Sequence, residues 1–120
     1  MFDHVGISVK DLQRSKEFYL KALAPLGLSL IMDFEVALGI GSPNKPFFWI
    51  AAGQATAPVH LAFAAQDRSQ VDAFYQAAMA AGGKDNGKPG LRPQYHPDYY
   101  GAFVIDLDGN NLEAVCHKPL

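Results

Sequence analysis

The chain has 120 residues, the length of one compact domain, and 49% of them are hydrophobic and 12% aromatic, which excludes a disordered chain. A net charge of −2, without any run of Lys or Arg, argues against a nucleic-acid partner. The single cysteine, Cys116, cannot form an intrachain disulfide, and neither a signal peptide nor a membrane span is visible, so we expect a cytoplasmic protein that binds no membrane.

The first half of the chain is predicted to contain one helix and four strands. Along the first strand, at 5–9, bulky residues alternate with small or polar ones, so one face is apolar and the other carries His4, Gly6 and Ser8. Asp11 is well placed as an N-cap. An apolar stripe with helical spacing follows it, formed by Phe18, Tyr19, Ala22, Leu23 and Leu26. Three further strands are predicted at 28–35, 36–42 and 46–52.

The second half begins as a repeat of the first. Residues 60–83 align without a gap on residues 4–27, which places His60 on His4 and repeats both the acidic cap and the aromatic pair of the helix. Such a repeat indicates two copies of one supersecondary unit. It also places a histidine at the start of each copy, so that the two side chains could converge on one centre.

The rest of the second half is predicted to hold a hairpin and a long loop. Asp108-Gly109 lies between two apolar runs, a strong hairpin signal. The segment 82–100 is dense in Gly and Pro and is too broken to predict as a regular strand. The pattern is βαβββ twice, in one domain whose modules span about 1–53 and 58–120.

These motifs resemble the vicinal oxygen chelate superfamily, which includes glyoxalase I, extradiol dioxygenases, fosfomycin-resistance proteins, epimerases and bleomycin-resistance proteins. The resemblance rests on a histidine that opens each copy, D-x3-S-x2-FY in the first helix and D-x-DGNNLEAV near the end. The last of these is most similar to bacterial glyoxalase/bleomycin-resistance/dioxygenase-type proteins. The resemblance implies an α+β fold in which the sheets of two βαβββ modules curve into a cup around a divalent metal.

The resemblance also implies that His4, His60 and Glu113 are the metal ligands. Strand alternation supports this: if the last strand lies beside the two histidine strands, Glu113 shares their small-residue face. Two histidines and one carboxylate suit one Fe, Mn, Ni or Zn ion per site, and ligand type alone does not choose among them. Each histidine by itself is equally consistent with an ordinary packed or exposed residue.

The first module departs from glyoxalase I, in which a second metal-binding carboxylate occupies the repeat equivalent of Glu113. Here that position falls at Trp49, within one residue, and no Asp or Glu lies between 36 and 66. One ligand and one base are therefore missing together. We do not expect a true glyoxalase I.

Acid–base and substrate-binding candidates come from the loop and from the aromatic strands. His96, Tyr99 and Tyr100 are the candidate catalytic residues, because an imidazole or a phenol beside a metal can transfer a proton. Simple loop packing is an equal alternative for the two tyrosines. The candidate substrate-binding residues are Trp49, Phe48, Phe34 and Arg92. The aromatic residues would equally suit a core or a dimer interface, and Arg92 a solvated loop.

Together these features predict a metal-dependent glyoxalase- or dioxygenase-like enzyme that binds a small organic substrate through two neighbouring oxygens. Lyase or isomerase chemistry is favoured over oxygenation. The alternative is a metal-free small-molecule or drug-binding protein like the bleomycin-resistance proteins. We also expect a homodimer, because modules of this kind pair either within a chain or between chains.

Overall fold

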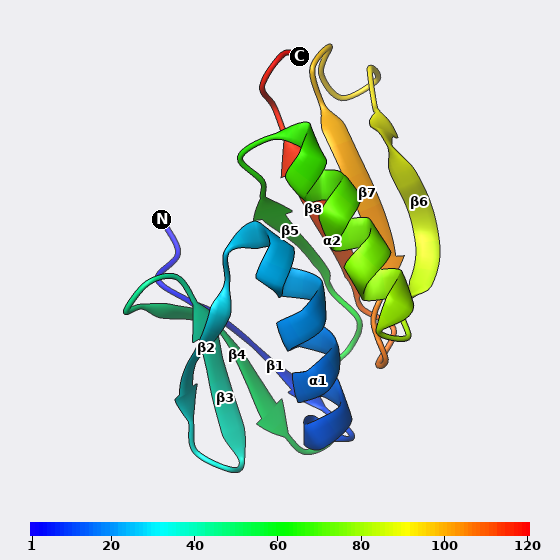
Figure 1. Ribbon diagram of the computed structural model, residues 1–120. Coiled ribbons are helices and arrows are strands. Elements are labelled where there is room, and N and C mark those ends of the chain that lie inside the picture. The colour runs from blue at the N-terminus through cyan, green and yellow to red at the C-terminus, as the bar shows by residue number, and fades with distance from the viewer.

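The computed structural model describes residues 1–120 as two modules of the same βαβββ order (Figure 1). The first module contains β1 (Val5–Val9), α1 (Leu12–Leu23), the short 3₁₀ helix η1 (Ala24–Leu26), β2 (Ser29–Asp33), β3 (Ala37–Gly41) and β4 (Pro46–Ala52). The second contains β5 (His60–Ala64), α2 (Arg68–Ala80), β6 (Lys84–Leu91), β7 (Tyr100–Ile105) and β8 (Asn111–Cys116). The predicted α+β class with two βαβββ modules is confirmed.

Each module forms a four-stranded mixed sheet with the same topology. The strand orders are β1-β4-β3-β2 and β5-β8-β7-β6, and in each the first strand runs parallel to the last. Both helices lie on one side of the sheets, as Figure 1 shows, and they pack against each other. We call the opposite side of each sheet its open face. Neither helix is long and apolar enough to span a membrane.

Both helices begin at the predicted caps. An Asp11 carboxylate oxygen accepts a hydrogen bond from the backbone N–H of Arg14 at 3.1 Å, and Asp67 accepts one from Gln70 at 2.8 Å. These contacts satisfy backbone donors that a helix start otherwise leaves free. The side chain of Gln70 reaches back to the backbone N–H of Gln66 at 2.8 Å and so extends the cap by one residue.

One prediction is wrong: the glycine- and proline-rich segment after α2 contains a long strand, β6. The strand pairs with β7 through a register that shifts twice, and the shifts lie around Gly87, whose φ is +152°. Bulges and a glycine absorb the irregular backbone. Because β6 is an edge strand, it also tolerates Pro89, which has no backbone N–H to donate to a neighbouring strand.

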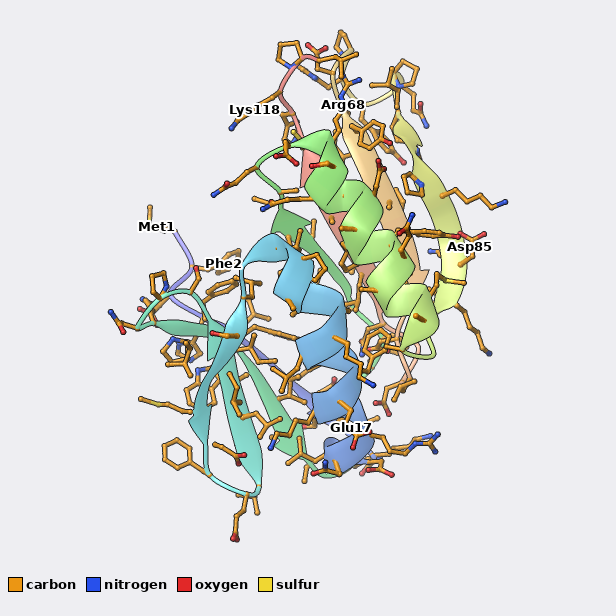
Figure 2. The ribbon with its side chains drawn as sticks, viewed as in Figure 1. Met1, Phe2, Glu17, Arg68, Asp85 and Lys118 are labelled. Atoms are coloured by element: carbon orange, nitrogen blue, oxygen red, sulfur yellow. The ribbon has the colours of Figure 1, made fainter.

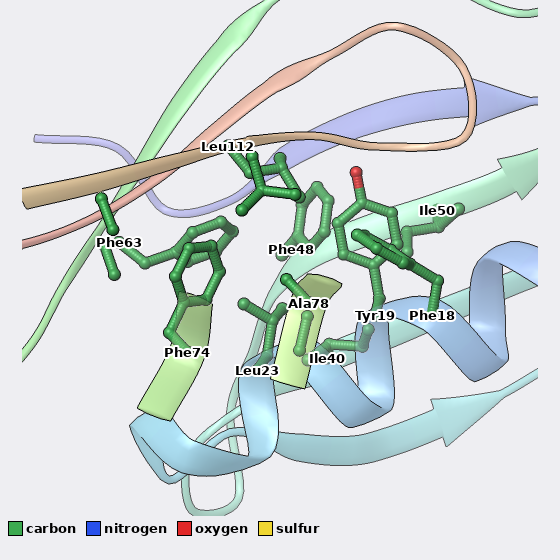
Figure 3. Packing of buried hydrophobic residues seen from close by; sticks show 14 of the residues in the cluster. Phe18, Tyr19, Leu23, Ile40, Phe48, Ile50, Phe63, Phe74, Ala78 and Leu112 are labelled. Atoms are coloured by element: carbon green, nitrogen blue, oxygen red, sulfur yellow. The ribbon is translucent and has the colours of Figure 1, made fainter. Parts of the chain in front are cut away.

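A single hydrophobic core joins the two modules. The ring of Tyr19 on α1 packs edge-on against Phe48 of β4 at 5.1 Å, and Phe48 packs edge-on against Phe63 of β5 at 5.6 Å. Figure 3 shows these rings beside Leu112 of β8, with the phenol oxygen of Tyr19 pointing away from the helix. The aromatic chain therefore crosses from the first module into the second.

A buried hydrogen bond reinforces this junction. The Tyr19 hydroxyl donates to Asp106, which lies in the β7–β8 loop and is 6% exposed. The same carboxylate closes the loop by accepting from the backbone N–H groups of Asp108 and Asn110 at 2.9 and 2.8 Å. Burial, and then the charge of Asp106, raise the pKa of Tyr19 well above its usual value, so the phenol stays a donor.

Replacing Tyr19 by Phe is expected to lower the free energy of unfolding by about 1–3 kcal/mol, because it leaves a buried carboxylate short of one donor. Urea-induced unfolding measures the change. Tyr75 occupies the equivalent position of α2 and is partly exposed, so Tyr75→Phe is the matched control and should stay within about 0.5 kcal/mol. Equal losses in the two variants would contradict the assigned role.

Candidate functional site

The open face of the second sheet carries a buried carboxylate with two protein partners. Glu113 of β8 is only 1% exposed. One of its oxygens lies 2.8 Å from Nε2 of His60, and the other accepts a hydrogen bond from the hydroxyl of Tyr99. Small neighbours make room for this group: Ala62 pairs with Glu113 across the sheet, and a Cβ atom built on Gly101 would lie 3.4 Å from its carboxylate. The small-residue pattern seen in the sequence thus leaves space for the carboxylate.

Tyr99 is held in place by the rings around it. Its own ring lies 5.1 Å from that of Tyr95 and 5.0 Å from that of His117, both in edge-on contacts. Desolvation, and then the hydrogen bond to Glu113, raise the pKa of Tyr99 to about 12. The phenol is therefore protonated at neutral pH and fixes the orientation of the Glu113 carboxylate.

The other two catalytic candidates lie apart from Glu113. His96 is exposed, and its Nδ1 accepts a hydrogen bond from the backbone N–H of Asp98 at 3.0 Å. Tyr100 lies on the helix side of the sheet, where its hydroxyl donates to Asp72 of α2 at 2.7 Å. Successive strand residues point to opposite faces, so Tyr99 and Tyr100 cannot both reach the open face. The structure brings only Tyr99 to the carboxylate.

His4 does not join this group within one chain. Its Nδ1 lies 2.8 Å from the Asp3 carboxylate, which also pairs with Lys45 at 2.6 Å. No cluster of three or more His, Cys, Asp and Glu side chains in the chain is arranged to hold a metal ion. The three predicted ligands are therefore divided into a His60–Glu113 pair and a separate His4.

His4 instead lines a cleft of about 690 Å³ between the two modules. Its walls are mostly apolar and include Phe48 and the segment 61–66. Phe2 and Lys118, from the two terminal segments, also line it and are labelled in Figure 2. Neither His60 nor Glu113 borders this cleft, so its volume and the chemically distinctive carboxylate are in different places. We place the candidate site at the carboxylate, because a buried charged group requires specific partners and an apolar hollow does not.

The first sheet presents an aromatic surface on its open face. Trp49 of β4 lies over Gly39, where an added Cβ would come within 2.9 Å of the indole, and it stacks on the exposed ring of Phe34 at 6.1 Å. Phe48 points the other way into the core and is only 2% exposed. Of the three aromatic residues predicted to bind substrate, Trp49 and Phe34 lie together on the open face. Phe48 lies on the core side of the sheet, where it lines the cleft.

The strand register identifies Trp49 as the repeat equivalent of Glu113. Gly6 pairs with Trp49, and Ala62, the repeat equivalent of Gly6, pairs with Glu113. The structure thereby removes the one-residue uncertainty that the sequence left. An indole occupies the position at which the second module carries its carboxylate.

Phe103 and Arg92 complete the surroundings of Glu113. Phe103 of β7 pairs with Glu113, its ring lies 6.1 Å from that of His60, and the guanidinium of Arg92 lies 5.3 Å from its centre. Phe103 was not among the predicted site residues. Alternation along the predicted last hairpin could have identified it, because Phe103 and Glu113 face each other across Asp108-Gly109.

Comparison with known proteins identifies relatives over the whole chain. A family model of the glyoxalase/bleomycin resistance protein/dioxygenase superfamily matches residues 1–114. Among solved structures, a glyoxalase/bleomycin resistance protein from Albidiferax ferrireducens T118 is 36% identical, with a TM-score of 0.84 and 99% of each chain covered. A search among curated proteins finds no significant match.

More distant structures share the fold. A glyoxalase/bleomycin resistance protein/dioxygenase family enzyme from Burkholderia phytofirmans PsJN is 18% identical, with a TM-score of 0.75 and 97% of this chain and 98% of that chain covered. A glyoxalase I mutant from Zea mays is 25% identical, with a TM-score of 0.72. The match covers 95% of this chain and 46% of the maize chain. The fold of this chain therefore corresponds to about half of the maize protein.

Proposed function

The chain belongs to the glyoxalase/bleomycin resistance protein/dioxygenase superfamily, and on this basis we propose that it is a metal-dependent enzyme acting on a small organic substrate through two neighbouring oxygens. We favour lyase or isomerase chemistry over oxygenation. The observation that carries the proposal is the buried Glu113 carboxylate in contact with His60. A carboxylate removed from water needs a strong partner, and a divalent cation supplies one.

The donor set of the His60–Glu113 pair fits a divalent metal. An imidazole nitrogen and a carboxylate oxygen within 2.8 Å of each other are suitable ligands for Fe, Mn, Ni or Zn. Tyr99 occupies the second carboxylate oxygen, so the first oxygen, which contacts His60, would bind the metal in a monodentate manner. One further protein ligand would complete a site with open positions for substrate.

We propose that His4 of a second chain supplies this ligand in a homodimer. Within one chain His4 is separate from the pair. Strands β1 and β5 are both edge strands of their sheets; β1 begins directly after His4, and β5 begins at His60. Exposed strand edges favour association with another chain, and a two-fold axis would create two identical sites.

Bound there, the metal would act as a Lewis acid on a chelated substrate oxygen. The protein's own residues would orient the metal ligand and exclude water. Tyr99, protonated at neutral pH, donates its single hydroxyl hydrogen to Glu113 and so holds the orientation of that carboxylate. The aromatic surface formed by Trp49 and Phe34 would cover an apolar part of the substrate and exclude water.

Mixing two inactive variants tests the shared site. His4→Ala and Glu113→Gln chains should each lack stoichiometric metal as homodimers. Co-expression of the two should restore roughly a quarter of the wild-type metal content, because half of the dimers are mixed and each mixed dimer has one intact site. Metal analysis of the purified proteins and light scattering provide the measurements.

Three outcomes would count against this proposal. Full metal content in His4→Ala would remove His4 from the ligand set. Loss of metal in both variants without recovery on mixing would place the whole site within one chain. A monomer at micromolar concentration would rule out the shared site altogether.

The second candidate is a metal-free protein that binds a small molecule. The observation that favours it is that both Glu113 oxygens already have protein partners, His60 and Tyr99. In that case wild-type protein purified without chelators should contain no stoichiometric metal and take none up from a buffered metal solution. The same metal analysis therefore separates the two candidates.

A further inference from the structure

The guanidinium of Arg92 is held in a fixed position beside the Glu113 group. Its two terminal nitrogens donate to the carbonyl oxygens of Gly90 and Lys88, both at 2.8 Å, and its central carbon lies over the ring of Phe103. The backbone N–H of Arg92 donates to the carbonyl of Tyr99 at 2.7 Å. This hydrogen bond fixes the backbone of Arg92 relative to that of Tyr99.

Two glycines of β6 make room for this arrangement. A Cβ atom on Gly87 would lie 3.1 Å from one terminal nitrogen of Arg92 and 2.9 Å from the Phe103 ring. A Cβ atom on Gly90 would lie 3.3 Å from the other terminal nitrogen. Side chains at either position would displace the guanidinium, so the strand forms a cradle for it.

The guanidinium of Arg92 has no ion-pair partner within the chain. None of the ion pairs includes Arg92. A guanidinium has five N–H donors, and the two carbonyl contacts leave others free. Its planar fork matches a carboxylate, and an anion bound there would be partly shielded from water by Phe103.

Phe103 is a neighbour that Arg92 and His60 share. The ring of Phe103 lies 5.3 Å from the Arg92 guanidinium and 6.1 Å from the ring of His60. An aromatic ligand whose ring packs against Phe103 would therefore have the Arg92 guanidinium and the His60 ring as neighbours.

We propose that Arg92 is a specificity-determining residue that binds the carboxylate of an aromatic or similarly sized organic acid, while a neighbouring oxygen of the same acid faces His60. This proposal rests on the proposed function, because it assigns a substrate class to that site. It predicts a preference for organic anions over neutral molecules of the same shape.

Salicylate and its neutral amide, salicylamide, provide the test, since they differ chiefly in the charge of one group. Calorimetric titration of the wild-type protein at neutral pH should show salicylate binding about 10- to 100-fold more tightly, as expected for one charge-assisted contact. In Arg92→Met, which keeps an apolar stem, the two affinities should become about equal. Arg92→Lys keeps the charge but loses the fork, so it should give an intermediate ratio.

The matched control is Lys84→Met, which removes an exposed positive charge from the same strand and should keep the wild-type ratio. Equal binding of the two compounds by the wild type, or no saturable salicylate binding, would overturn the proposal. So would the same loss in Lys84→Met, or an unchanged ratio in Arg92→Met or Arg92→Lys. If Arg92→Met fails to fold, Arg92→Lys decides.

The outcomes also distinguish this proposal from the metal assignment. Arg92→Met should keep the wild-type metal content while losing the preference for salicylate. Wild-type protein treated with a chelator should lose the metal and keep that preference. A protein that never binds metal but still prefers salicylate through Arg92 would overturn the proposed function and leave the carboxylate site intact.

Discussion

Changing Glu113 to Gln is expected to abolish stoichiometric metal binding while the protein stays folded. The substitution preserves the shape of the side chain, and its amide can still bond to His60 and Tyr99, so the buried position remains satisfied. A neutral amide is a poor ligand for a transition metal. The affinity should fall by more than the roughly 10- to 100-fold that the loss of an outer hydrogen-bond partner costs. His60→Ala should have the same consequence through the other ligand.

Metal content per chain, measured on protein purified without chelators, gives the result, and circular dichroism reports the fold. Glu17→Gln is the matched control, because it makes the same chemical change at an exposed carboxylate of α1 that bonds only to Gln13. Unaltered metal content in both Glu113→Gln and His60→Ala would show that the ion binds elsewhere.

Glyoxalase I turnover of the methylglyoxal–glutathione adduct is expected to be absent or very weak with any divalent metal. That reaction moves a proton between neighbouring carbons and needs a base within about 3 Å of the carbon that loses it. Trp49 occupies the position at which the first module would supply a carboxylate, and an indole nitrogen is only a donor. Since a general base contributes about 10²–10⁴-fold, its absence alone should reduce turnover by that factor.

Assays of protein loaded separately with Ni, Zn, Mn and Fe measure this expectation. Turnover near the roughly 10 s⁻¹ of an average enzyme would show that another base serves the site. Trp49→Glu is the informative variant: the glycines on either side, Gly6 and Gly39, leave room for the new carboxylate. The new carboxylate would occupy the position of the first module that is equivalent to Glu113 in the second module. The variant should therefore have measurable activity although its parent has none.

The fold could be predicted because local patterns and the repeat agree. Alternating strands, two acidic caps and two apolar helical stripes each specify one element, and the repeat shows that both halves follow one plan. The strand at 84–91 could not be predicted from local patterns. Glycine and proline lower the local preference for a strand, and only pairing with β7 compensates for it.

The candidate site could be predicted only in part, because local patterns specify single strands and not how distant segments meet. Alternation places Glu113 opposite the small residues of its sheet, and the register bears this out through its pairing with Ala62. Alternation also separates Tyr99 from Tyr100, although both were predicted as catalytic residues. Successive side chains of a strand point to opposite faces, so the sequence is enough to say which residues of one strand share a face.

Local sequence patterns suffice to assign residues to each module and each strand side chain to one side of its sheet. How the two modules meet depends on tertiary packing. The helices pack against each other, Tyr19 donates to Asp106 across the junction, and His4 lies apart from Glu113. The strand period acts between neighbouring residues and carries no information about the docking of two sheets. Docking follows from complementary surfaces that are far apart in the chain, so the position of His4 relative to the carboxylate could not be predicted from either copy of the repeat.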